Sequence, residues 1–252
     1  MKKLVLITLL TVFAFNSFAW NRLGHAVAVA VAQRHLTEEA KKNIARYIDY
    51  DLKQDASWMD MHRKEEHLNY TDHWHSYCVD ENFNHDPNTS DKKLRYGDNL
   101  RALQVCESTL RNKRYEQIPD SLVVMSIRTL IHMVPDMHCP VHVRYNHKTN
   151  PRGNFEINGK TYKGFHKLYD SMPSVIWGET PADEVAEKID NASRREIKKI
   201  ISGDIYDWVT DIARKNVVIF DIEPTDSYDL VNTQLRDAGY RLAYLLNHYF
   251  GE

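Results

Sequence analysis

Long apolar runs are absent from this sequence apart from one near the N-terminus. Leu4–Phe15 has about a dozen residues, whereas a membrane-spanning helix needs about 20. The run follows a basic start, Lys2-Lys3, and precedes Ser17-Phe18-Ala19, which supplies small residues for a signal peptidase. We therefore predict that residues 1–19 are a cleaved signal peptide, with an uncleaved anchor as the alternative. Cleavage makes Trp20 the first residue of an exported protein, either periplasmic or secreted.

A strong charge of one sign is also lacking. The chain has 33 basic and 35 acidic residues, and removal of the two leader lysines leaves a formal charge of −4. This balance argues against a broad basic face that grips duplex nucleic acid through many phosphates. A polyanion would have to be attracted locally, for example by bound metal ions.

Cysteines are few and odd in number. Cys78, Cys106 and Cys139 follow the signal peptide into an oxidising compartment, where one disulfide can form and one cysteine is left over. We predict a disulfide between Cys78 and Cys106, because Cys139 lies in a histidine-rich segment.

Alternating strand patterns are scarce, and linkers, tandem repeats and low-complexity tracts are absent. The only convincing hairpin is residues 154–164, with Asn158-Gly159 as its turn. Residues 84–99 and 145–164 hold most of the glycine, proline and asparagine and are predicted to be loops.

Apolar residues at helical spacing are common instead. They predict helices over 22–36, from Glu38 after the capping Thr37, and over 98–115, 121–134, 183–202, 204–219 and 226–248. The 233 residues left after cleavage suit one core better than two. We predict an all-α fold, in which residues 20–252 form a single mostly helical domain with one small β-hairpin.

Histidine is plentiful, with 13 in the chain, and two H-x-x-x-D pairs stand out. His132 with Asp136, and His166 with Asp170, would each face the same way, since four residues make about one helical turn. A single pair of this kind is more often a surface hydrogen bond or ion pair. These pairs lie within apolar sequence, where a metal ion would neutralise costly buried carboxylates. Zinc takes both ligand types.

The chain carries a series of ordered motifs that resembles the zinc-dependent, single-strand-preferring nucleases of the S-one/P-one type. The family's W-G-x-x-G-H start is matched by Trp20-Asn21-Arg22-Leu23-Gly24-His25, and its A-x-W-x-D segment by Ala56-Ser57-Trp58-Met59-Asp60. The later motifs correspond to Trp74, His75 and Tyr77, to His132, Asp136, Pro140 and His142, and to His166 and Asp170. The resemblance covers residues 20 to about 172, and residues 237–247 resemble the family's closing helix.

This resemblance implies the phospholipase C/nuclease fold and a trinuclear-zinc domain that holds three Zn²⁺ ions. In the family the N-terminal tryptophan is a ligand through its amino nitrogen and carbonyl oxygen, so cleavage after Ala19 would create a ligand. A tryptophan that only fills the core is the alternative. The implied ligands are Trp20, His25 and Asp136 for one zinc, Asp60, His75, His132 and Asp136 for a second, and His142, His166 and Asp170 for the third.

The implied function is hydrolysis of single-stranded DNA or RNA to 5′-phosphate products, with 3′-nucleotidase activity. A metal-activated water, and no protein side chain, would be the nucleophile. We expect a monomer that acts on nucleic acids and nucleotides. After cleavage of the signal peptide, we expect no association with a membrane. A zinc-dependent phospholipase C is the nearest alternative, although the spacing from Trp20 to His25 and the aspartate at 170 favour the nuclease. A non-catalytic zinc-binding protein is the other alternative.

The region that would bind the base departs from the family pattern, which leaves DNA, RNA and base preference open. Asn154, Phe165 and Tyr145 are candidate substrate contacts, with core packing the favoured role for the two aromatic residues. Asp80 is a candidate for orienting the water, with a solvated surface acid as the favoured alternative.

Two further departures lie in the central motif. Pro135 replaces the glycine usual before the bridging aspartate, and a proline inside a helix removes a hydrogen bond and kinks the helix. Such a kink would either open the ligand face or spoil it. Cys139 replaces a frequent glutamine; a thiolate can bind zinc, but a buried bystander or a disulfide partner is the favoured interpretation.

Overall fold

The structure is a computed structural model that describes residues 20–89, 92–94 and 97–251. The predicted signal peptide, residues 1–19, therefore lies outside the described residues. Within the described ranges, every helix is too short or too polar to span a bilayer.

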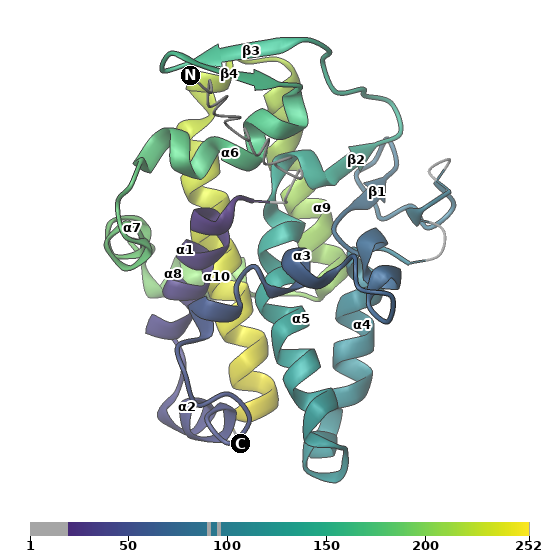
Figure 1. The fold of residues 1–252 in the computed structure, drawn as a ribbon, viewed down its shortest axis with the longest axis vertical. Helices are drawn as coiled ribbons and strands as arrows, with labels where there is room; N and C mark the ends of the chain where they lie inside the picture. The colour runs from purple at the N-terminus through teal and green to yellow at the C-terminus, as the bar shows by residue number, and fades with distance from the viewer. Residues whose placement is uncertain (1–19, 90–91, 95–96, 252) are drawn as a thin grey trace, which may run out of the picture.

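The described residues form ten α-helices and two small sheets of two strands each (Figure 1). The α-helices are α1 (Arg22–Arg34), α2 (Glu38–Ile44), α3 (Trp58–His62), α4 (Asn99–Leu110), α5 (Asp120–His138), α6 (Phe165–Trp177), α7 (Ala182–Ile189), α8 (Arg194–Ile200), α9 (Ile205–Asn216) and α10 (Tyr228–Phe250). The strands are β1 (Tyr77–Val79), β2 (Val143–Tyr145), β3 (Asn154–Ile157) and β4 (Lys160–Lys163). Short 3-10 helices include η1 (Leu52–Asp55), η2 (Asn69–His73), η4 (Arg111–Gln117), η5 (Pro140–His142), η6 (Val217–Phe220) and η7 (Pro224–Ser227). This mostly helical single domain confirms the predicted fold class.

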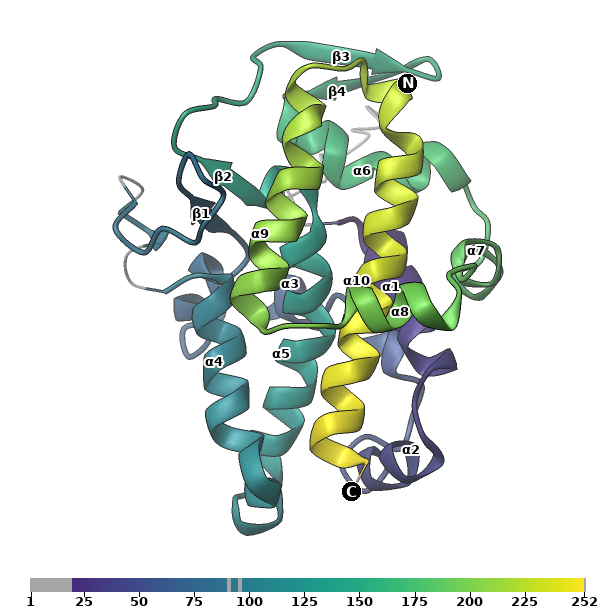
Figure 2. The ribbon, with the colours of Figure 1, turned by 180° about the vertical axis from the view of Figure 1, so that it is seen from behind.

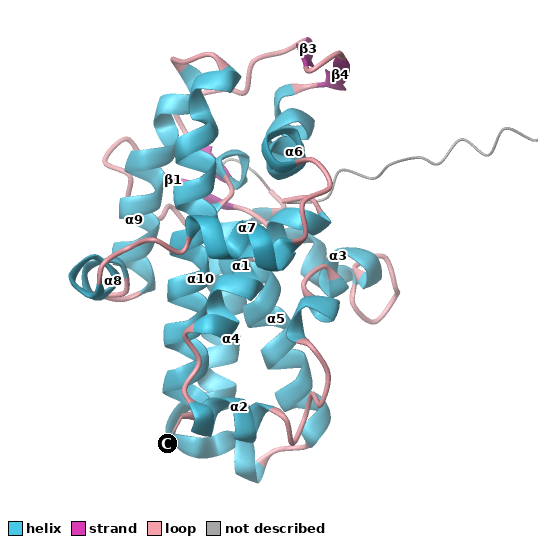
Figure 3. Ribbon diagram, turned by 90° about the vertical axis from the view of Figure 1, so that its left-hand side faces the viewer, coloured by secondary structure: helices cyan, strands magenta, loops and turns pink. Residues whose placement is uncertain are grey.

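Helix α5 is the central element, with α4, α10 and α1 packed around it (Figures 1 and 2). Every residue from Thr129 to His138 is buried, so this end of the helix has no solvent face. One apolar cluster surrounds α2, α4, α5, α9 and α10, and a second surrounds α6, α7 and the adjoining faces of α1 and α10. The side view in Figure 3 shows α6 and the β3–β4 hairpin toward the end of the molecule opposite the C-terminus.

Most predicted helices are confirmed, but residues 183–202 do not form one helix. Helix α7 ends at Ile189 and α8 begins at Arg194. The Asp190 carboxylate between them accepts hydrogen bonds from Arg34 and Tyr240, which fixes the chain in a non-helical course. Ser193 then starts α8 with a capping box, so the break has its own local signal in the sequence.

The predicted hairpin is confirmed: β3 and β4 are antiparallel, and Asn158 (φ 53°) and Gly159 (φ 72°) form its turn. Two positive φ angles in succession are what a type I′ turn requires. The parallel pair β1–β2 was not predicted, because its strands have three residues each and lie more than 60 residues apart. Its register sets Tyr77 opposite Val143 and so brings together the segments that precede both strands, which include His75 and His142.

The predicted disulfide is wrong, because Cys78, Cys106 and Cys139 are each free and buried. The side chains of the first two face different neighbours. The Cys78 thiol lies 2.9 Å from Asn146 Oδ1, and the Cys106 thiol lies 3.6 Å from the Ser126 carbonyl oxygen.

Candidate metal centre

Eight histidine and aspartate side chains from separate parts of the chain converge between α1, α5 and α6. They come from α1 (His25), α3 (Asp60), the turn before β1 (His75), α5 (His132 and Asp136), η5 (His142) and α6 (His166 and Asp170). All eight were predicted as metal ligands, and the fold brings all eight together. Seven of them are at most 5% exposed.

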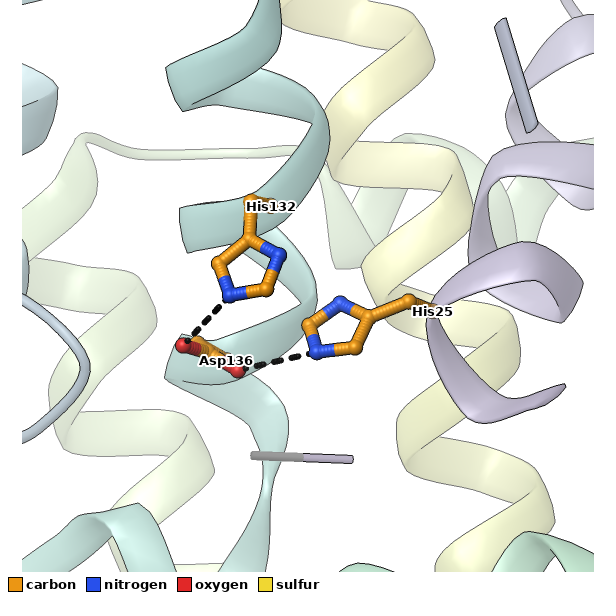
Figure 4. Close-up of side chains that lie close together, drawn as sticks. All are labelled: His25, His132 and Asp136. Carbon is orange, nitrogen blue, oxygen red and sulfur yellow. Dashed lines mark ion pairs between the residues drawn. The ribbon is translucent and has the colours of Figure 1, made fainter. Parts of the chain in front are cut away.

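The Asp136 carboxylate lies at the centre of this cluster, and Figure 4 shows it between His25 and His132. Its Oδ1 is 3.3 Å from His25 Nε2, and its Oδ2 is 3.5 Å from His132 Nε2 and 2.8 Å from His75 Nδ1. The two oxygens therefore face different imidazoles, an arrangement suited to a carboxylate that bridges two ions. Pro135 does not prevent this geometry, because α5 continues to His138.

Asp60 forms a second group with His75 and His132. Its two oxygens lie 3.8 Å from His75 Nδ1 and from His132 Nε2. The Nδ1 of His132 is 2.8 Å from the Ala56 carbonyl oxygen, to which it donates. That hydrogen bond fixes the tautomer and leaves the lone pair of Nε2 directed at the two carboxylates.

Asp170 is the centre of a third group. Its Oδ1 is 3.8 Å from His142 Nε2, and its Oδ2 is 3.5 Å from His166 Nε2. Asp170 is buried, whereas the His166 side chain is 34% exposed, so the cluster reaches solvent at this histidine. The sulfur of Cys139 lies 4.0 Å from Asp170 Oδ1.

Many buried polar atoms in the cluster have no hydrogen-bond partner. They are both ring nitrogens of His25, both oxygens of Asp60, His75 Nε2, Asp136 Oδ1 and His142 Nδ1. Unpaired buried polar atoms are rare in proteins, and several in one place require a specific cause. Three sets of potential ligand atoms lie within 4.8 Å of one another: His25, His132 and Asp136; Asp60, His75 and His132; and Cys139, His142 and Asp170. The residues therefore fit a polynuclear metal centre.

The protonation of three of these histidines is also suited to metal binding, whereas Asp136 and Asp60 raise the pKa of His75 despite its burial. Burial lowers the pKa of His142 to about 3, that of His166 to about 4, and that of His132 well below its usual value. These imidazoles are neutral at pH 7, which is the form that coordinates metals. Burial raises the pKa of Asp60, whereas the surrounding histidines hold the pKa of Asp136 well below normal despite its burial.

Side chains from distant elements hold the C-terminal end of α5. The carbonyl oxygens of Met133, Pro135, Met137 and His138 accept hydrogen bonds from Asn99, Trp20, Tyr77 and Asn216, respectively. The last four carbonyl groups of a helix lack helical partners, so the donors to Pro135, Met137 and His138 satisfy groups that would otherwise be buried and unpaired, and Asn99 adds a contact one turn earlier. They also fix the turn that carries Asp136.

The start of the described chain is tied to the same region. The Trp20 side chain is fully buried, and its Nε1 donates to Pro135, the neighbour of Asp136. The backbone N–H of Asn21 donates to the Asp170 carbonyl oxygen over 2.7 Å. A Cβ at Gly24 would lie 2.8 Å from Pro173 and 2.9 Å from Trp20, so a glycine is needed where α1 meets α6.

The weaker candidates have other roles in the structure. Tyr145 is buried and donates to the Ala213 carbonyl oxygen, and Phe165 is buried among Phe155, Tyr169 and Phe220, as the core-packing alternative predicted. Asp80 accepts hydrogen bonds from the backbone N–H groups of residues 82 and 84, so its carboxylate stabilises a turn. Asn154 is exposed at the start of β3.

Sequence reasoning missed Arg63 as a neighbour of the centre. Its Nη1 is 3.7 Å from Asp60 Oδ1 and 3.5 Å from Asp72 Oδ1, and its side chain is only 14% exposed. The signal was present as the D-x-x-R spacing, which places Asp60 and Arg63 one turn apart.

Comparison with known proteins identifies one family. The model of the family described as S1/P1 Nuclease matches residues 20–251. A search of curated proteins found no match. The family match begins at Trp20 and extends over nearly all of the described chain.

Proposed function

Because this chain belongs to the S1/P1 nuclease family, we propose that it is a zinc-dependent phosphodiesterase that acts on single-stranded DNA or RNA. Membership makes the protein a nuclease, a hydrolase of phosphodiester bonds. The finer proposal is that its products carry 5′-phosphates and that it also removes the 3′-phosphate from nucleotides. The observation that carries the metal dependence is the set of unpartnered buried atoms on His25, Asp60, His75, Asp136 and His142.

We assign the ligands of three zinc positions from these distances and from the family pattern. His25 and Asp136, with Trp20, would hold the first. Asp60, His75, His132 and Asp136 would hold the second, and His142, His166 and Asp170 would hold the third. Five of the eight side chains are imidazoles, which suit zinc, whereas magnesium prefers oxygen ligands. Three carboxylates offset only half the charge of three Zn²⁺ ions, which leaves positive charge to attract a phosphate.

The proposed role of Trp20 depends on processing. Cleavage after Ala19 would turn its backbone nitrogen from an amide, which has no available lone pair, into an amine that can coordinate zinc. Its indole hydrogen bond to Pro135 holds the residue beside the turn that carries Asp136. Export through residues 1–19 and release into the periplasm or medium are part of this proposal.

Zinc ions at these positions would supply an activated water near neutral pH and stabilise the attacking and leaving oxygens of the phosphate. The residues of the chain orient this centre: the Ala56 carbonyl oxygen holds His132, and Asp136 aligns three imidazoles. Arg63, whose Nη1 lies 3.7 Å from Asp60 Oδ1, would donate to a non-bridging phosphate oxygen. In the reaction the water oxygen bonds to phosphorus, the bond from phosphorus to O3′ breaks, and O3′ takes up a proton.

Preference for single strands follows if a base must leave its stack to bring the phosphate to the centre, since a duplex resists this by a few kcal/mol. The overall formal charge of −4 after cleavage provides no broad attraction for duplex DNA. Of the candidate substrate contacts, Asn154 has an exposed side chain, whereas Phe165 and Tyr145 are engaged in packing.

The test uses zinc-replete protein whose mass establishes Trp20 as its first residue. We expect it to cleave single-stranded DNA and RNA faster than a duplex of the same sequence, to leave 5′-phosphate ends, and to release phosphate from a 3′-nucleotide. A zinc-replete preparation that cleaves none of these would contradict the proposal and favour a zinc-binding protein. Release of phosphocholine from phosphatidylcholine would favour a phospholipase C.

The role of the N-terminus has its own prediction. Protein that begins at Trp20 should bind three zinc ions, and protein with one extra residue ahead of Trp20 should bind about two. Zinc content is measured by elemental analysis on both forms. Equal zinc content in both forms would show that the terminal amine is not a ligand, whatever the nuclease assay gives.

A further inference from the structure

The third group of the centre contains a side chain that the ligand set above leaves out. We propose that Cys139, as a thiolate, is a fourth protein ligand of the third metal position, beside His142, His166 and Asp170. This inference rests on the proposed function, because it concerns the same centre. It also goes beyond that function, since it assigns a sulfur ligand and gives the third ion a role different from those of the other two.

The distances around Asp170 carry the assignment. A tetrahedral zinc with a Zn–S bond of about 2.3 Å and a Zn–O bond of about 2.0 Å separates sulfur from oxygen by about 3.5 Å. Cys139 Sγ lies 4.0 Å from Asp170 Oδ1, and His142 Nε2 lies 3.8 Å from the same oxygen. His166 Nε2 is 3.5 Å from the other carboxylate oxygen. A contraction of about half an ångström would bring these atoms to ligand spacing.

The surroundings of Cys139 fit a ligand better than a bystander. The residue is fully buried, yet its sulfur faces a carboxylate. The sulfur lies within 4.8 Å of ligand atoms of both His142 and Asp170. A disulfide is excluded because all three cysteines are free, and Cys78 and Cys106 have hydrogen-bond acceptors of their own.

The local backbone also presents the sulfur suitably. Cys139 follows the last residue of α5 and precedes η5, so it lies at the turn between Asp136 and His142. Its spacing to His142 is C-x-x-H, a short separation of the kind that places two ligands on one zinc. The backbone N–H of His142 donates to the Cys139 carbonyl oxygen over 3.0 Å, which closes the turn that carries the sulfur.

A thiolate at this position changes what the third ion does. Four protein ligands close a tetrahedral site, whereas a catalytic zinc keeps a position open. Thiolate and Asp170 together also balance the charge of one Zn²⁺ ion. The third ion would then be mainly structural and the most tightly held, and the pair that shares Asp136 would act on the phosphate.

The experiment measures sulfur ligation directly, without reference to activity. Zinc X-ray absorption on the Trp20 form with three bound ions should show one sulfur neighbour at about 2.3 Å shared among three zincs. Protein loaded with cobalt should show a thiolate-to-cobalt charge-transfer band. Cys139→Ser should lose both signals, and Cys106→Ser, which removes another buried cysteine, should keep both at wild-type intensity.

The outcomes separate this assignment from the proposed function. Wild-type protein that binds three zinc ions and cleaves nucleic acid, yet shows no sulfur neighbour, would overturn the role of Cys139 alone. Protein that binds no zinc would overturn both. If Cys139→Ser does not fold, alkylation of the wild-type protein tests the assignment. One thiol should be protected from a maleimide by zinc and should react once a chelator removes the zinc. Mass mapping should locate that thiol at Cys139. Protection at no cysteine, or at another one, would overturn the assignment.

Discussion

At the scale of single residues, Asp136 determines how the centre is organised. Its two oxygens face His25 on one side and His75 with His132 on the other, all in a fully buried setting. A carboxylate can serve two ions in this way because both of its oxygens carry lone pairs, whereas an amide has one oxygen and a donor nitrogen. Asparagine has nearly the same size as aspartate but only one oxygen, so it is an informative replacement.

Asp136→Asn should therefore lose zinc at the two positions that share this residue. We expect zinc content to fall from three ions to about one and kcat/KM to fall on the order of a thousandfold, which corresponds to about 4 kcal/mol. Elemental analysis and nuclease assays measure both effects. Asp190→Asn, which changes a half-buried aspartate outside the centre, is the control and should keep three ions. Full zinc occupancy in Asp136→Asn would contradict the bridging role.

At the scale of elements, the close crossing of α1 and α10 places His25. A Cβ at Gly239 on α10 would lie 2.5 Å from Val31 and 2.9 Å from the Ala28 carbonyl oxygen, both on α1. Helix propensity alone favours alanine over glycine by about 1 kcal/mol. The added Cβ would clash with a β-branched side chain and with backbone, which cannot move aside easily. The clash should therefore outweigh the gain in helix propensity and make the alanine variant less stable.

Gly239→Ala should destabilise the protein by about 1–3 kcal/mol, the usual cost of overpacking. Urea unfolding of the wild type and variant measures the difference. Val31→Ala removes part of the obstructing side chain, so the double variant should be less destabilised than the sum of the single variants. A stabilised Gly239→Ala protein, or strictly additive effects, would show that the helices can separate without loss.

A second element-scale prediction concerns the break between α7 and α8. Burial alone would raise the pKa of Asp190, but hydrogen bonds from Arg34, His35 and Tyr240 outweigh it and lower that pKa. A carboxyl whose pKa is lowered by folding stabilises the protein above its unfolded pKa, and this contribution is lost as pH falls through the folded value.

Asp190→Asn should thus cost about 1–3 kcal/mol at pH 7, with a smaller deficit at pH 3. Unfolding of zinc-free wild type and variant at both pH values isolates this carboxyl from the metal ligands. A deficit that stays constant across this range would mean that the charge of Asp190 does not contribute to its hydrogen bonds.

At the scale of the whole molecule, the metal centre joins the two apolar clusters. Its ligands come from α1, α3, α5 and α6 and from the turns before β1 and β2, so bound ions would connect segments that are up to 145 residues apart, from His25 to Asp170. Without metal, the cluster retains unpartnered nitrogens and oxygens that are buried. Metal binding and global stability should therefore be coupled.

Zinc removal should lower the melting temperature by at least about 8 °C. One zinc site contributes about 4 kcal/mol to the free energy of unfolding when the free zinc concentration is about a thousand times its Kd. The melting temperature of a domain of this size shifts by roughly 2–4 °C per kcal/mol. Calorimetry with and without a chelator measures the change. Added zinc should restore the original temperature, whereas magnesium should not, because it prefers a shell of oxygen ligands. An unchanged melting temperature would argue against metal linkage to the fold.

The sequence by itself determined the local features of this protein. Helical spacing predicted most of the helices, Asn158-Gly159 predicted the hairpin turn, and four-residue spacing placed His132 above Asp136. The ordered motifs selected eight side chains that the fold brings together, because short-range spacing and ligand chemistry are written directly in the chain.

The tertiary structure decided how those features meet. Only the fold pairs β1 with β2, turns the two oxygens of Asp136 to different histidines, and sets Cys139 against Asp170 and away from the other cysteines. These contacts join residues far apart in the chain, and which contacts form depends on how whole helices bury their apolar faces. No local pattern contains that information, because the free energy that selects the arrangement comes from packing the entire domain.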